Sequence, residues 1–104
     1  MRKDYDKLVR DEIPRIIEAS GKHCVTEILT GEAYVDKLEE KLSEELAEYL
    51  ESKSLEEMAD LLEVMEALVA ARGESWEEVK RLQTEKREKR GGFEGRILLR
   101  RVED

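Results

Sequence analysis

Two short groups of acidic residues carry the clearest chemical signal in this sequence of 104 residues. The first is Glu44-Glu45-x-x-Glu48, and the second is Glu57-x-x-Asp60. Residues three apart share one face of a helix, with Cβ atoms about 5–6 Å apart, so each group projects carboxylates together. Oxygen-only ligand sets suit Mg²⁺ or Mn²⁺ and not zinc. If the two groups converge, they form a candidate divalent-cation site.

A solvated helix face is the alternative interpretation of these acids. The chain contains 27 Asp and Glu residues, so such spacings arise easily by chance. Glu57 also has a structural role available, as the capping-box partner of Ser54. Asp60 favours the functional interpretation, because it interrupts the apolar run from Met58 to Met65, where an unpaired carboxylate is costly to bury.

The acids need two neighbouring helices to bring them together. Apolar residues recur every three or four positions after Thr30, which predicts a long helix through residues 31–52. Ser54 then opens a helix over residues 55–72 that is apolar on most sides. The break at 52–54 lets these helices run antiparallel, so both acidic groups lie near one end of the pair. Burial of the second helix on all sides requires a partner subunit.

The flanking segments complete the expected fold. We expect a first helix that starts near Asp11, with Pro14 in its first turn and Gly21 as its left-handed cap. Residues 23–29 and 96–102 are predicted to form two paired strands, and a last helix runs from Trp76 to the glycine pair after residue 90. The predicted fold is mainly α: one domain over residues 1–104, an antiparallel helical bundle with a small two-stranded β accessory, completed by dimerisation.

Composition excludes several classes of protein. The formal charge of −8 argues against binding to a nucleic-acid polymer, and no apolar run approaches the roughly 20 residues that span a membrane. The first residues lack the apolar core of a secretory signal, and the single cysteine, Cys24, cannot form an internal disulfide. We therefore expect a cytoplasmic protein. Abundant Glu, Lys and Arg without asparagine is typical of a thermophile.

The acidic pattern resembles the metal-binding signature of the MazG-like all-α nucleoside triphosphate pyrophosphohydrolases. The opening YDKLVRDEIPRII and the closing KREKRGGFEGRILL resemble the ends of a small phosphoribosyl-ATP pyrophosphohydrolase-like branch of that superfamily. The likeness covers nearly the whole chain. It implies a magnesium site, with manganese as a substitute, and it assigns the metal ligands as Glu45, Glu48, Glu57 and Asp60. It also implies Glu44 and Glu45 as the catalytic acids, with Glu44 as an accessory acid that orients a water and Glu45 as a metal ligand as well.

A triphosphate also needs cations to bind its phosphates. Lys86, Lys89 and Arg90 supply them just before a pair of glycines, where a backbone can approach an anion closely. Before the resemblance is considered, these cations are equally well explained by the negative end of the helix dipole. Lys7 and Arg10 near the N-terminus are weaker candidates for the same role.

The resemblance implies an enzyme that cleaves nucleoside triphosphates between the α- and β-phosphates, giving a monophosphate and pyrophosphate. Removal of unwanted nucleotides by a homodimer is the leading hypothesis. A phosphoribosyl-ATP pyrophosphohydrolase of histidine biosynthesis is the first alternative. A noncatalytic helical binding module, which keeps the fold and binds without turnover, is the second.

Overall fold

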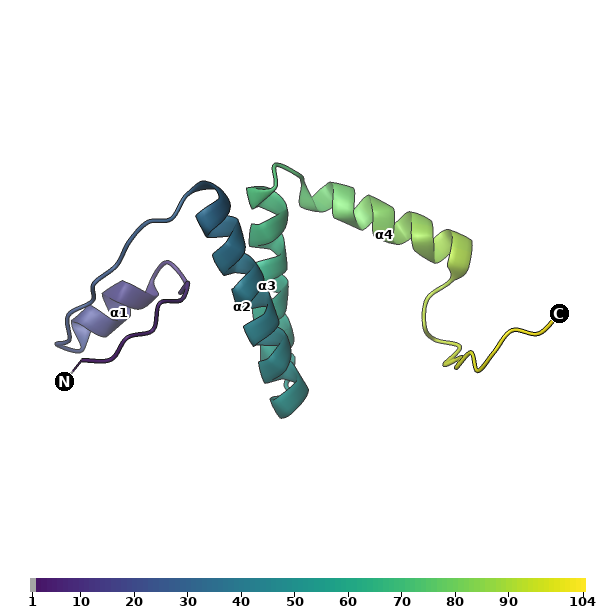
Figure 1. Ribbon diagram of the computed structural model, residues 1–104, viewed down its shortest axis with the longest axis horizontal. Helices are drawn as coiled ribbons and strands as arrows, with labels where there is room; N and C mark the ends of the chain where they lie inside the picture. The colour runs from purple at the N-terminus through teal and green to yellow at the C-terminus, as the bar shows by residue number, and fades with distance from the viewer. Residues whose placement is uncertain (1) are drawn as a thin grey trace. The chain divides into compact units, whose positions relative to one another are not determined.

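Four helices make up the regular structure of the computed structural model, which describes residues 2–104 (Figure 1). Helices α1, α2, α3 and α4 span Ile13–Ala19, Gly31–Ser52, Leu55–Ala71 and Trp76–Arg90. The chain divides into two compact units, Met1–Glu74 and Ser75–Asp104, and each is described separately. The mainly α fold is therefore confirmed, and one domain over residues 1–104 stays a prediction.

Helices α2 and α3 form an antiparallel hairpin in the first unit (Figure 1). The chain reverses within two residues, because Lys53 adopts a left-handed conformation with φ of 59° and its N–H donates to the Tyr49 carbonyl at 2.7 Å. Ser54 then caps α3, with its Oγ accepting from the Glu57 N–H at 3.2 Å. The predicted N-cap at Ser54 is confirmed, but the reciprocal bond of the capping box is absent from residues 2–104: the Ser54 N–H donates to Ser52 Oγ at 3.2 Å and not to the Glu57 side chain. This tight reversal places the last turns of α2 beside the first turns of α3.

The core of the hairpin is small. Leu38 of α2 and Val64 of α3 are buried, with 5% and 8% of their surfaces exposed. Glu45 is as buried as these two apolar residues, at 6% exposed. A carboxylate within so small a core requires a physical explanation, because an uncompensated buried charge destabilises a fold.

Helix α3 is only partly covered by the residues that the structure describes. Its contact with α2 accounts for one side, while an apolar stripe on the helix stays exposed, at Leu55, Met58, Leu62 and Met65. None of the helices between residues 2 and 104 has the length and apolar character that a bilayer span requires. The expected partner subunit for α3 is taken up below as part of the proposed function.

The helix ends otherwise follow the sequence signals closely. Helix α1 begins after Glu12, one residue later than the predicted cap, and the chain leaves it through Gly21 with φ of 94°. In the second unit, Ser75 caps α4 by accepting from the Glu78 N–H at 3.1 Å, and Gly91 ends the helix with φ of 81°. Both glycines occupy the left-handed region that other residues rarely adopt.

The predicted β accessory is absent from residues 2–104, which contain helices and no strand. The segments 23–29 and 96–102 are irregular instead. Val25 and Ile28 in the first segment are 92% and 90% exposed, and Ile97 in the second is 89% exposed. Strand propensity alone does not stabilise a strand, because its backbone N–H and C=O groups need hydrogen bonds to a neighbouring strand. The prediction of a strand pair is therefore wrong for the single chain.

Candidate functional site: an acidic cluster between α2 and α3

The tight reversal after Ser52 brings the two acidic groups of the sequence together. Oxygens of Glu45, Glu57 and Asp60 all lie within 4.8 Å of one another, and so do oxygens of Glu44, Glu45 and Glu48. Glu45 belongs to both groups and joins them into one acidic cluster. The convergence expected from the spacing is thus present in the structure, with carboxylates from both helices.

Two carboxylate oxygens of the cluster are buried without a partner. Oε2 of Glu45 and Oε2 of Glu57 are shielded from solvent, and neither accepts a hydrogen bond from any residue in the described range 2–104. The other oxygen of Glu45 lies 3.3 Å from Nζ of Lys41, so only one of the two carboxylate oxygens of Glu45 has a partner. Buried carboxylate oxygens that lack donors are the groups a divalent cation would satisfy.

Burial and the crowding of like charges raise the pKa values of two carboxyl groups in the cluster. Burial, followed by the negative charge of Glu48, raises the pKa of Glu57 to about 7. Burial and a hydrogen bond shared with Glu48 also raise the pKa of Glu45 above its ordinary value. The metal-free cluster therefore retains protons that an isolated carboxyl group would lose. A bound divalent cation would reverse this preference by favouring the charged carboxylates.

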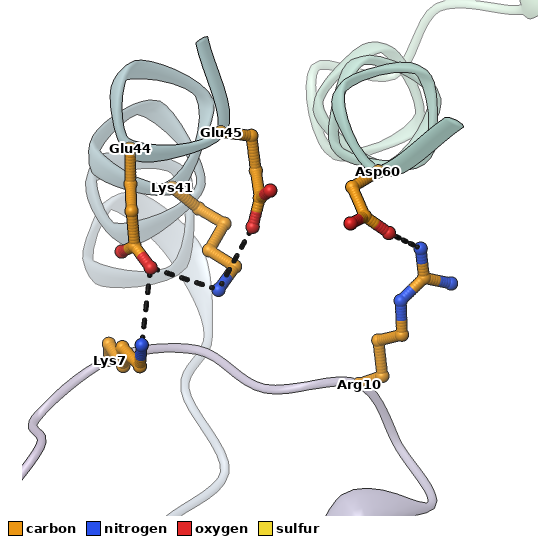
Figure 2. A network of polar contacts seen from close by, with 6 residues as sticks. All are labelled: Lys7, Arg10, Lys41, Glu44, Glu45 and Asp60. Atoms are coloured by element: carbon orange, nitrogen blue, oxygen red, sulfur yellow. Dashed lines mark hydrogen bonds and ion pairs between the residues drawn. The ribbon is translucent and has the colours of Figure 1, made fainter. Parts of the chain in front are cut away.

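Three basic side chains line the edge of the acidic cluster (Figure 2). Lys7 Nζ donates to Glu44 Oε1 at 3.2 Å, and Lys41 Nζ lies 3.5 Å from the same oxygen. Arg10 Nη2 donates to Asp60 Oδ1 at 2.7 Å. Burial acts to raise the pKa of Glu44, but the hydrogen bond from Lys7 and the charge of Lys41 outweigh it, so that pKa is lowered. Glu44 therefore stays charged at the edge of the cluster.

Sequence reasoning missed part of this arrangement. Lys41 was not singled out, although it precedes Glu44 and Glu45 by three and four residues, the spacing that pairs charges on a helix. Lys7 and Arg10 are the weaker phosphate-binding candidates of the sequence, and the structure places both beside the acids. No local pattern reveals this proximity, because it depends on how the N-terminal segment crosses the hairpin.

The predicted phosphate-binding residues lie elsewhere in the chain. Lys86, Lys89 and Arg90 are exposed in the last turns of α4, within the unit Ser75–Asp104. In this unit Arg87 pairs with Glu94, beyond the glycine pair that follows the helix. Placement of basic residues at the carboxyl end of α4 also suits the helix dipole. Their role in binding phosphate stays a prediction.

Three comparisons with known proteins found no match. No protein-family model matches the chain, and no curated protein or solved structure matches it significantly. The chemistry of the acidic cluster therefore follows from its own residues.

The cluster fits a hard divalent cation by the chemistry of its donors. All the candidate ligands are carboxylates, they come from two helices that are held by a tight turn, and two of their buried oxygens lack donors. Mg²⁺ and Mn²⁺ select such oxygen-rich sites, and Mg²⁺ keeps several water molecules as further ligands. Acidic groups on a solvated surface would not leave Glu45 buried at 6% exposed.

Proposed function

We propose that this chain is a Mg²⁺-dependent nucleoside triphosphate pyrophosphohydrolase of the MazG-like type. The observation that carries the proposal is the buried, half-compensated carboxylate of Glu45 beside Glu57 and Asp60. The acidic pattern and both end motifs of the sequence resemble that superfamily, which supports the same activity. In this proposal Glu45, Glu48, Glu57 and Asp60 hold the metal, and Mn²⁺ can replace Mg²⁺.

The reaction proposed is hydrolysis between the α- and β-phosphates. A water oxygen bonds to phosphorus while the bridging P–O bond breaks, giving a nucleoside monophosphate and pyrophosphate. Bound Mg²⁺ lowers the pKa of water and neutralises charge on the phosphate oxygens. Glu44 lies at the edge of the cluster, where Lys7 and Lys41 lower its pKa in the metal-free chain, and its charged carboxylate would orient the attacking water.

Dimerisation belongs to the same proposal, and the exposed stripe of α3 supports it. Leu55, Met58, Leu62 and Met65 follow one another at intervals of three, four and three residues. This spacing forms one apolar seam along a helix, as at the interface of paired helices. A second copy of the chain offers the same seam, so a symmetric contact would cover both.

Pyrophosphate release tests the proposed activity. The purified chain is incubated with a panel of nucleoside triphosphates and with phosphoribosyl-ATP, with Mg²⁺, Mn²⁺ or a chelator. We expect release with either metal and none with the chelator. Asp60→Asn should reduce the rate by at least about tenfold, since it removes a charged ligand worth more than about 1.4 kcal/mol. Glu39→Gln, at an exposed position of α2, is the matched control and should leave the rate unchanged.

The pattern of results separates the candidate functions. Turnover of phosphoribosyl-ATP alone would assign the chain to histidine biosynthesis, and turnover of several triphosphates would support nucleotide-pool cleaning. Metal binding without turnover of any substrate would leave a noncatalytic binding module and refute both enzymatic functions.

A further inference from the structure

One extended segment before α1 places a cation against each helix of the hairpin. Lys7 reaches Glu44 on α2, with 3.2 Å between Nζ and Oε1. Three residues later, Arg10 reaches α3, where Nη2 lies 2.7 Å from Asp60 Oδ1 and Nη1 lies 3.9 Å from Glu63 Oε1. Figure 2 shows this segment crossing below both helices, with both cations directed at the acids.

The backbone of this segment is anchored independently of the two cations. Lys37 Nζ of α2 donates to the backbone oxygen of Asp6 at 3.2 Å, just before Lys7. Asp6 itself has a positive φ of 47°, which turns the chain at this point. The segment would therefore stay beside the acidic cluster if the contacts of Lys7 and Arg10 were exchanged for others.

Both ion pairs are open to solvent, so Lys7 and Arg10 can leave their carboxylate partners for another anion. The side chains of Lys7 and Arg10 are 42% and 57% exposed. Pairs this exposed contribute little to stability, because water screens the charges and the long side chains lose freedom. A divalent cation on Asp60 would weaken its attraction for Arg10 further, since it neutralises the carboxylate. The guanidinium of Arg10 is also the side chain best suited to two-point binding of phosphate.

We propose that Lys7 and Arg10 form the phosphate-binding edge of the metal site: they rest on Glu44 and Asp60 in the metal-free chain and transfer to the phosphate oxygens of the metal-bound substrate. This inference rests on the proposed function, and it adds two substrate-binding residues within the same unit as the acids. Arg10 then plays opposite roles for the two ligands, as a competitor of the metal and a partner of the phosphate.

Arg10→Gln tests this inference, because it should change the affinities for Mn²⁺ and pyrophosphate in opposite directions. Calorimetry measures Mn²⁺ binding without phosphate, and then inorganic pyrophosphate binding at saturating Mg²⁺. We expect Arg10→Gln to bind Mn²⁺ about two- to fivefold more tightly, the range of an exposed ion pair. The same variant should bind pyrophosphate about tenfold more weakly, because a charge-assisted contact is lost. Arg10→Lys should recover part of the pyrophosphate affinity.

Arg15→Gln is the matched control. Arg15 lies on α1 and pairs with Glu12 at 2.6 Å, away from the acids of the cluster, so its replacement should change neither affinity. Lys7→Gln provides a second test at the other cation and should also weaken pyrophosphate binding. Circular dichroism establishes that each variant keeps the helical content of the wild type.

The outcomes distinguish this inference from the function on which it rests. Opposite shifts for Mn²⁺ and pyrophosphate support it. Weaker binding of both ligands by Arg10→Gln would show a merely structural role and overturn it, as would affinities equal to those of Arg15→Gln. If the wild type binds neither Mn²⁺ nor pyrophosphate, the proposed metal site fails, and this inference fails with it.

Discussion

Replacement of Glu45 by glutamine should stabilise the metal-free protein while removing its response to metal. Glu45 is 6% exposed, and one of its oxygens is buried without a donor in residues 2–104. An unsatisfied buried group costs about 1–3 kcal/mol, and the ion pair with Lys41 offsets part of that cost. The amide of Glu45→Gln removes a negative charge and can donate to the neighbouring carboxylates. We expect a gain of about 1 kcal/mol, or about 4–8 °C in melting temperature.

Metal binding should raise the melting temperature of the wild type much more than that of this variant. At a metal concentration about 100 times Kd, binding stabilises the folded state by about 2.7 kcal/mol, which raises Tm by roughly 10–20 °C. If loss of the shared ligand weakens Kd about 100-fold, the same concentration stabilises the variant by only about 0.4 kcal/mol. The difference between these two increments is large enough to measure reliably.

Thermal denaturation followed by circular dichroism, with and without Mg²⁺, is the assay. Glu39→Gln removes the same charge from an exposed position of α2 and is the control for net charge. It should shift the metal-free Tm only slightly and keep the full metal increment. A metal-free Glu45→Gln protein that is less stable than the wild type, and that still gains stability from metal, would refute the argument from burial.

Three further predictions follow from the same structure. The pKa of Glu57 is raised from 4.5 to about 7 in the folded state. Protonation of Glu57 therefore stabilises the fold fully below pH 4.5, and this contribution is lost as the pH rises through 7. Measurement of Tm across this pH range should show the loss, and Glu57→Gln should make Tm less dependent on pH. Ser54→Ala removes the cap of α3 and should cost about 1 kcal/mol in urea denaturation, whereas Ser43→Ala at an exposed position in the middle of α2 should cost much less. Met58→Glu puts a charge in the exposed seam of α3, so sedimentation should show a monomer where the wild type is a dimer; a monomeric wild type would contradict the proposed interface.

The hairpin that carries the acids could be predicted because its signals are local. Apolar periodicity defined α2 and α3, and Ser54 with Glu57 marked the start of the second helix, which the structure confirms by the hydrogen bond to the Ser54 hydroxyl. Spacing within each helix and a short reversal then sufficed to bring Glu45 and Asp60 together. Each of these signals involves residues that lie close together in the sequence.

The parts that sequence reasoning missed depend on contacts between distant residues. The predicted strand pair is absent from residues 2–104. Residues 23–29 favour an extended backbone, but no other described segment of the single chain pairs with them. The placement of Lys7 and Arg10 could not be predicted, since 37 and 50 residues separate them from Glu44 and Asp60. The deep burial of Glu45 was also missed, although this residue lies seven positions after the buried Leu38 and therefore on the same face of α2.

A crystal structure of the chain with Mn²⁺ and a nonhydrolysable nucleoside triphosphate tests the central claim most directly. Anomalous scattering identifies manganese independently of the protein atoms. We expect an anomalous peak coordinated by carboxylate oxygens of Glu45, Glu48, Glu57 and Asp60, with phosphate oxygens of the nucleotide completing the coordination. A peak bound elsewhere, or a nucleotide bound away from these carboxylates, would contradict this claim.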